Sequence, residues 1–236
     1  MEPRFDLAGE TRQNQPAVNH RPGFITFAYA LFAAACATAS EPPPRFVRLA
    51  DVAPSIRQDI RYAGSDNFTG RPVPGYAAAE CWLRKEAALA LATVQTDALK
   101  QGLKLVVYDC YRPQRATNAF VKWANDDADQ IAKDRFFPGI EKRALFSQGY
   151  ISRRSSHSTG LAVDIAIDGL DFGTTFDFFD PRSSTYSLLV TRAAAANRRT
   201  LEELMRHRGY SNYKREWWHF TYNGVHDPKA WDIELK

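Results

Sequence analysis

Two short polar motifs, far apart in the chain, carry the side chains of one chemical site. The first spans 155–164 and reads SSHSTGLAVD; the second spans 216–219 and reads EWWH. Together they supply two imidazoles, one carboxylate ligand and a further glutamate. That set can hold a zinc ion with one open coordination position and a general base beside it. A fold that uses both motifs must bring two distant segments into contact.

We expect His157, Asp164 and His219 to be the ligands of one zinc ion per chain. Two imidazoles and a carboxylate leave the fourth zinc position open for water. A single histidine is usually a hydrogen-bonded structural residue. This chain has only five histidines, however, and two of them fall within these motifs, which favours the metal interpretation.

Two further residues fit the chemistry of such a site. Glu216 precedes His219 by three positions and can take a proton from water and return it to a leaving amine. On a regular strand, positions i and i+3 point to opposite faces, so Glu216 either precedes the strand or is turned inward by a bulge. Arg112 follows an apolar run and precedes Pro113, which limits its backbone freedom. We interpret Arg112 as a stabiliser of a developing oxyanion, although Arg-Pro alone indicates only a surface ion pair.

The hydrophobic pattern predicts an α+β fold. Helices are expected over 80–100, ending at Gly102; from Pro113 to about 124; and from a capping box at Thr200–Glu203 to Gly209. Strands are expected over 56–62, 104–108, 161–167 and 218–222, and 67–76 is expected to be a loop. The pattern of 125–149 assigns no element. The irregular order predicts one domain with a mixed or antiparallel sheet packed with helices.

Length and charge restrict the function classes. The chain has 236 residues, enough for one substantial domain, and a formal net charge of +4. Its basic residues are scattered and form no nucleic-acid motif, so we expect no nucleic-acid partner. The densest pairs, Arg153–Arg154 and Arg198–Arg199, are expected to be solvated surface. The oligomeric state stays open.

The first forty residues are expected to be a leader, followed by the folded domain at 41–236. Phe24–Ala35 is uncharged, about as long as a signal-peptide core, and is followed by an A-x-A cleavage site at Ala37–Ala39. Lipoprotein processing at Cys36 is the alternative, and such an anchor would be the only membrane contact. A disordered tail is the plainer interpretation. We expect an exported, periplasmic protein, or a cytoplasmic one if the leader does not function.

Two cysteines remain in the expected domain, Cys81 and Cys110. They are either joined by a disulfide, as an oxidising compartment allows, or present as two buried thiols. Neither has the spacing of a metal ligand.

The motifs SSHSTGLAVD, EWWH and YDCYRP together resemble those of zinc-dependent D-alanyl-D-alanine dipeptidases of the vancomycin-resistance type. The wider group includes D-Ala-D-Ala carboxypeptidases and hedgehog-like domains. The resemblance runs from about Asp59 to Phe220 and includes the segment RYAGSDNFTGRPVPGY. It implies the fold of this group and the small-molecule substrate D-Ala-D-Ala. It also implies the zinc ligands named above, Glu216 as base and acid, and Arg112 as transition-state stabiliser.

The same resemblance implies substrate-binding residues. Asp177 would bind the free ammonium group of the substrate, and Ser155 and Tyr76 match positions near the pocket. Cys110 departs from the family, which usually has glycine there. The export leader is also not general in the family.

Two other functions stay open at this point. A D,D-carboxypeptidase acting on longer peptidoglycan peptides would need an open pocket on the amino side of its substrate. A zinc-containing binding module without turnover would be expected to lack a catalytic residue, yet both Glu216 and Arg112 are present.

Overall fold

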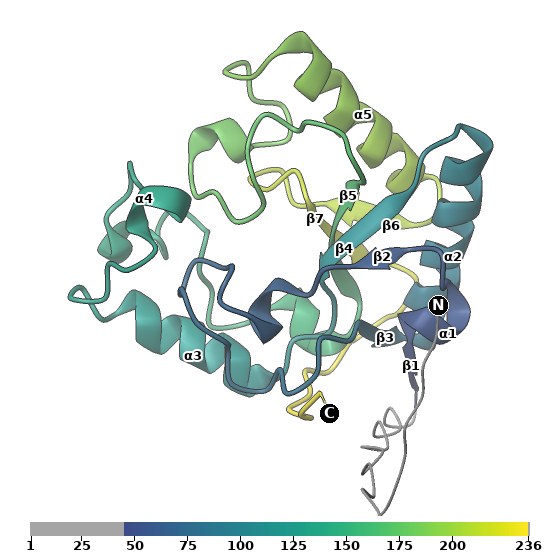
Figure 1. The fold of residues 1–236 in the computed structure, drawn as a ribbon. Helices are drawn as coiled ribbons and strands as arrows, with labels where there is room; N and C mark the ends of the chain where they lie inside the picture. The colour runs from purple at the N-terminus through teal and green to yellow at the C-terminus, as the bar shows by residue number, and fades with distance from the viewer. Residues whose placement is uncertain (1–44, 236) are drawn as a thin grey trace, which may run out of the picture. The chain divides into compact units, whose positions relative to one another are not determined.

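The computed structural model describes residues 45–235, so the predicted leader lies outside the described residues. A five-stranded mixed sheet has the order β2–β4–β5–β7–β6 (Figure 1). Its strands are Arg57–Gln58, Leu105–Asp109, Ala162–Ile167, His219–Tyr222 and Tyr210–Asn212, in that order. β2 runs parallel to β4, and the other neighbours are antiparallel. The predicted α+β class with a mixed sheet is confirmed.

Helices and a small second sheet complete the fold. β1 (Phe46–Arg48) pairs antiparallel with β3 (Trp82–Arg84). The α-helices are α1 Leu49–Val52, α2 Lys85–Lys100, α3 Gln114–Ala124, α4 Lys133–Phe136 and α5 Arg192–Arg206. Four 3-10 turns are Arg61–Ala63, Lys142–Ala144, Ser156–Thr159 and Pro181–Ser183. In Figure 1, α2 lies to the right of the sheet and α5 above it, with α3 and α4 on its left-hand side. Within 45–235, no helix has the length and apolarity needed to cross a membrane.

Most predicted elements of the central sheet are confirmed. β4 and β5 lie at the predicted apolar runs, and β7 covers all but the first residue of its predicted strand. α3 begins directly after Pro113, which takes the cap position. Every residue of β5 is buried, because side chains from both faces of this strand lie inside the protein.

The predicted start of the long helix at position 80 is wrong. Trp82–Arg84 forms β3, and α2 begins only at Lys85. The segment contains neither glycine nor proline, so nothing local marks the boundary. Pairing of β3 with β1, which lies far away in sequence, decides it. The predicted end near Gly102 is confirmed, since Gly102 has the left-handed φ of 72°.

The capping box predicted at Thr200–Glu203 is also wrong. α5 starts at Arg192, and its cap is Thr191, whose Oγ1 accepts a hydrogen bond from the Ala194 backbone N–H at 3.1 Å. Thr200 lies inside the helix and donates to the Ala196 carbonyl. The alanine-rich turn before it has high helix propensity, so the helix extends back to the stronger cap.

The strand predicted over 56–62 is much shorter than expected. Only Arg57–Gln58 pairs with β4, and a 3-10 turn follows at Arg61–Ala63. The turn buries Tyr62 in the interior, where its hydroxyl reaches the functional site described below. The glycine- and proline-rich segment at 67–76 is a loop, as predicted.

Gly160 allows a close approach between the first motif and β1. It ends the Ser156–Thr159 turn with a φ of 74°, and a Cβ here would lie 2.3 Å from Cε1 of Phe46. Gly102 has nearly the same φ, but a Cβ there would meet nothing within 4 Å. The two positions therefore separate backbone strain from steric clash.

We expect Gly160→Ala to destabilise the protein more than Gly102→Ala. A side chain in the left-handed region costs roughly 1–2 kcal/mol at either position. Only Gly160→Ala must also displace the buried Phe46 ring. Urea unfolding of the two variants measures the difference. Equal losses of unfolding free energy would show that the Phe46 ring moves aside without cost.

Candidate active site

Three side chains converge on one point beside the central sheet. In the antiparallel register, Asp164 of β5 lies directly opposite His219 of β7. The turn that precedes β5 carries His157. The atoms His157 Nε2, Asp164 Oδ1 and His219 Nδ1 are 3.1 Å from one another. Donors bound to one tetrahedral zinc ion are about 3.3 Å apart, so the three predicted ligands fit a metal ion.

Hydrogen bonds orient both imidazoles for metal binding. His157 Nδ1–H donates to the Cys110 carbonyl at 2.6 Å, which leaves the Nε2 lone pair facing the other ligands. His219 Nε2 lies 3.1 Å from Ser156 Oγ, so its Nδ1 faces inward. Burial lowers the pKa of His219 and favours the neutral imidazole that a metal requires.

Glu216 lies before the last strand, which decides between the two arrangements that the sequence left open. β7 starts at His219, and the Glu216 N–H donates to the Tyr213 carbonyl within the preceding turn. Its Oε2 is 3.9 Å from His219 Nδ1. Burial, followed by repulsion from Asp164 and Asp177, raises the pKa of Glu216 well above its usual value. Its carboxyl group can therefore hold a proton more readily than a surface glutamate.

Arg112 is held by a fully buried aspartate. Its Nε and Nη2 donate to Asp109 Oδ2 at 2.9 and 2.7 Å. The guanidinium carbon lies 5.0 Å from the ring centres of Tyr62 and Phe120. Nη2 is also 3.7 Å from Asp164 Oδ2, which places the cation beside the predicted metal ligands.

Asp177 is a buried acid in an unusual backbone conformation. Its φ is 60°, and its Oδ2 accepts a hydrogen bond from the Tyr62 hydroxyl at 2.9 Å. Burial and the charge of Asp164 raise the pKa of Asp177 well above its usual range. A cation entering beside it would favour the ionised carboxylate again.

These groups line one cavity of about 290 Å³. Ligand pockets span roughly 300–1,000 Å³, so the cavity suits a small substrate. The predicted site residues on its wall are His157, Asp164, His219, Glu216, Arg112, Asp177 and Ser155. The Ser155 Oγ also accepts a hydrogen bond from the His157 N–H at 3.2 Å, so it caps the turn that carries this ligand.

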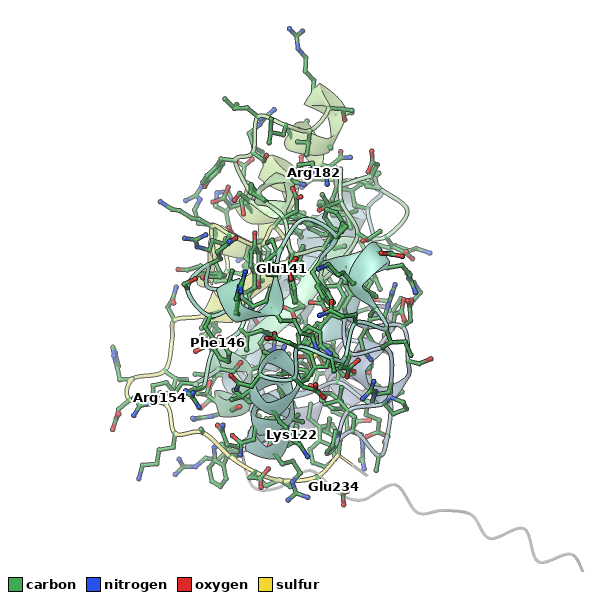
Figure 2. The ribbon with its side chains drawn as sticks, turned by 90° about the vertical axis from the view of Figure 1, so that its left-hand side faces the viewer. Lys122, Glu141, Phe146, Arg154, Arg182 and Glu234 are labelled. Carbon is green, nitrogen blue, oxygen red and sulfur yellow. A yellow bond between two sulfur atoms is a disulfide. The ribbon has the colours of Figure 1, made fainter. Side chains whose placement is uncertain are left out.

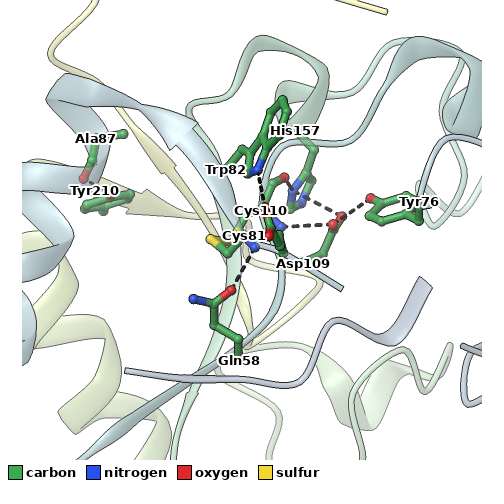
Figure 3. The surroundings of a disulfide bond; sticks show 10 residues. Gln58, Tyr76, Cys81, Trp82, Ala87, Asp109, Cys110, His157 and Tyr210 are labelled. Atoms are coloured by element: carbon green, nitrogen blue, oxygen red, sulfur yellow. Dashed lines mark hydrogen bonds and ion pairs between the residues drawn. A yellow bond between two sulfur atoms is a disulfide. The ribbon is translucent and has the colours of Figure 1, made fainter. Parts of the chain in front are cut away.

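Tyr76 lies behind the cavity and is not among its lining residues. Its hydroxyl donates to Asp109 Oδ1 at 2.6 Å (Figure 3). This aspartate also holds Arg112. The hydroxyl of Tyr76 therefore supports the aspartate that holds Arg112, and its contact with substrate stays a prediction. The sequence match placed Tyr76 near the pocket but could not tell a residue on the cavity wall from one behind it.

Of the two arginine pairs that were predicted to be surface, only Arg198 differs from that prediction. Arg153 and Arg154 are exposed, and Figure 2 shows Arg154 at the surface of the molecule. Arg198 is instead 1% exposed and donates to the carbonyls of Phe172, Arg182 and Ser184. Burial lowers its pKa to about 10. From α5, its guanidinium fastens both ends of the segment that carries Asp177.

Tyr62, Asp109 and Arg198 are the supporting residues that the motifs did not assign. Asp109 and Tyr62 do lie in segments that carry the family resemblance, which was the available signal. The register places Asp109 opposite Asp164, after an irregularity between Val107 and Asp109 in β4. No sequence pattern marks Arg198 as buried.

Comparison with known proteins shows the family to which the chain belongs. The family model described as D-ala-D-ala dipeptidase matches residues 44–230. A D-alanyl-D-alanine dipeptidase of Enterococcus faecalis is 38% identical over 181 residues, which are 74% of this chain and 90% of that protein. One of Enterococcus faecium is 35% identical over 198 residues, which are 81% of this chain and 98% of that protein.

A solved structure of the LdcB LD-carboxypeptidase is also similar. It is 21% identical, with a TM-score of 0.42, over 76% of this chain and 68% of that chain. The family match and the two dipeptidases confirm the resemblance seen in the motifs. The chain is a metallopeptidase that belongs to the D-Ala-D-Ala dipeptidase family of M15 peptidases.

Proposed function

We propose that this enzyme hydrolyses the D-alanyl-D-alanine dipeptide to two D-alanines, with one zinc ion per chain. The observation that carries the proposal is the shared cavity. It combines three converging metal ligands, a glutamate of raised pKa, a buried arginine and a buried aspartate on one wall. The related enterococcal proteins carry the name of this activity.

Zinc fits the donor set of His157, Asp164 and His219. Two neutral imidazoles and one carboxylate, each oriented by other groups, are typical of catalytic zinc sites. When bound, the ion supplies a Lewis acid that polarises the scissile carbonyl and acidifies water.

The chain's own residues supply the proton transfers and charge stabilisation. Glu216 accepts a proton from the attacking water, and its raised pKa suits it to pass that proton to the leaving amine. Arg112 lies beside the ligands with a fixed orientation, so it can donate to the oxyanion as negative charge develops. Asp109 holds this arginine in place, and Tyr76 in turn holds Asp109.

Asp177 provides the selectivity for a free dipeptide. A buried carboxylate on the cavity wall attracts the substrate ammonium and disfavours an acylated nitrogen, which has no charge to pair with it. Ser155 lies on the same wall, where its hydroxyl can contact the bound dipeptide. A carboxypeptidase of longer peptides would have no use for this buried acid.

Glu216→Gln should lower kcat by roughly 10²–10⁴-fold, since general acid–base catalysis contributes about that much. The substitution keeps the shape of the side chain and removes its proton transfer. D-Alanine release from D-Ala-D-Ala measures the rate, and metal analysis confirms that zinc is retained. A folded, zinc-loaded variant with wild-type turnover would refute the assigned role.

Asp177→Asn should raise KM for D-Ala-D-Ala at least tenfold, because loss of a charge-assisted contact costs about 1.4 kcal/mol or more. It should also reduce the preference for the free dipeptide over N-acetyl-D-Ala-D-Ala. Asp171→Asn is the matched control, since Asp171 is an exposed acid of the same segment. An unchanged preference in Asp177→Asn would contradict the ammonium role.

We also propose that residues 1–40 direct export of the enzyme to the periplasm. There it would act on dipeptide released from peptidoglycan. The Cys81–Cys110 disulfide supports this, because disulfides persist mainly in oxidising compartments. Fractionation of cells that produce the full chain, with Cys36→Ser as a variant, tests both export and a lipid anchor. Recovery of the unprocessed chain in the cytoplasm would refute export.

A further inference from the structure

The disulfide lies directly behind the metal ligands. Cys81 immediately precedes β3, and Cys110 immediately follows β4 (Figure 3). Both residues are only 1% exposed. The cross-link therefore joins the small two-stranded sheet to the segment that leaves the central sheet at the active site. The proposed chemistry assigns it no role.

Both peptide groups of Cys110 contact the site. Its carbonyl accepts the hydrogen bond from His157 Nδ1 at 2.6 Å. Its N–H donates to Asp109 Oδ1 at 2.9 Å, and Asp109 in turn holds Arg112. Movement of the Cys110 backbone would thus disturb both His157 and Asp109, the residue that holds Arg112.

Other contacts of the residues that follow Cys110 also hold this backbone, among them the packing of the buried Tyr111 ring against Phe46. The Tyr111 N–H donates to the Trp82 carbonyl at 2.9 Å, which ties the next residue to β3. The Arg112 N–H donates to the His157 carbonyl at 3.2 Å, a bond within the site itself. The covalent bond to Cys81 restrains the position of Cys110 more strongly than either hydrogen bond.

We propose that the Cys81–Cys110 disulfide is a positioning element for the metal centre. It holds the Cys110 carbonyl against His157, so that this imidazole is preset in the tautomer and orientation that zinc requires. The inference rests on the zinc site of the proposed function. Loss of a group that hydrogen-bonds to a metal-binding histidine typically weakens metal affinity by about 10–100-fold. The disulfide therefore controls zinc affinity through the hydrogen bond between His157 and the Cys110 carbonyl.

The proposal also makes zinc affinity sensitive to reductants. A water-soluble phosphine attacks one sulfur and breaks the Cys81 Sγ–Cys110 Sγ bond. The two electrons come from phosphorus, water supplies the oxygen of the phosphine oxide, and the two sulfurs become thiols. The Cys110 carbonyl then loses its covalent restraint and keeps only non-covalent ones, which include the hydrogen bond and the packing of the neighbouring Tyr111.

The test measures zinc affinity by competition with a chelator of known affinity, at a temperature where circular dichroism shows every sample folded. We expect the double variant Cys81→Ala/Cys110→Ala to bind zinc 10–100-fold more weakly than the oxidised wild-type chain. Wild-type chain that has been reduced with the phosphine, and then separated from it under anaerobic conditions, should also bind zinc more weakly. Reoxidation should restore the zinc affinity. The reduced wild-type chain tests the proposal even if the double variant does not fold.

Leu91→Ala in α2 is the control for a purely stabilising cross-link, because it destabilises the core away from the cavity. Leu91→Ala should lower the melting temperature and leave zinc affinity unchanged. Wild-type zinc affinity in the folded double variant, or in the reduced chain, would overturn the positioning role. Failure of the oxidised wild-type chain to bind zinc would instead refute the proposed function.

Discussion

The register of three neighbouring strands underlies the active site. Asp109 of β4 pairs with Asp164 of β5, and Asp164 pairs with His219 of β7. Directly paired residues project to the same face of a sheet. Hydrogen bonding between the strands therefore aligns Asp109, which holds Arg112, with the two predicted metal ligands Asp164 and His219. A shift of one residue would turn Asp164 to the opposite face and abolish the site.

The site concentrates negative charge in the interior. Four acidic side chains, those of Asp109, Asp164, Asp177 and Glu216, lie close to the buried guanidinium of Arg112, and the exposed Arg154 also lines the cavity. The pKa values of Asp177 and Glu216 are raised because burial and mutual repulsion disfavour their ionised forms. A divalent metal ion and a substrate ammonium would offset this charge. The electrostatics therefore favour the cations that the proposed reaction needs.

Supporting contacts extend from this row into the rest of the domain. Arg198 on α5 holds the segment of Asp177, and Trp217 Nε1–H donates to Thr174 Oγ1 in that segment. The two tryptophans of EWWH thus belong to the interior, where Trp217 stacks on Phe172. On the opposite side, Tyr76 and the disulfide restrain the segment of Asp109 and Cys110. Elements distant in sequence thus hold both the segment of Asp177 and the segment of Asp109 and Cys110.

The sequence by itself determined the candidate ligands, the β5 strand and the glutamate and arginine of the site. Rare residue types at defined spacing, and apolar alternation around Asp164, are local signals that survive without tertiary information. The same is true of α3, because Pro113 marks its start.

Only the tertiary structure decided the features that depend on distant contacts. The start of α2 follows from pairing of β3 with β1, and the inward position of Glu216 from where β7 begins. The burial of Arg198, the placement of Tyr76 behind the cavity and the joining of Cys81 to Cys110 are equally non-local. The neighbours of a residue in sequence do not determine which remote carbonyl, carboxylate or thiol it will contact. The packing of the whole chain decides these contacts.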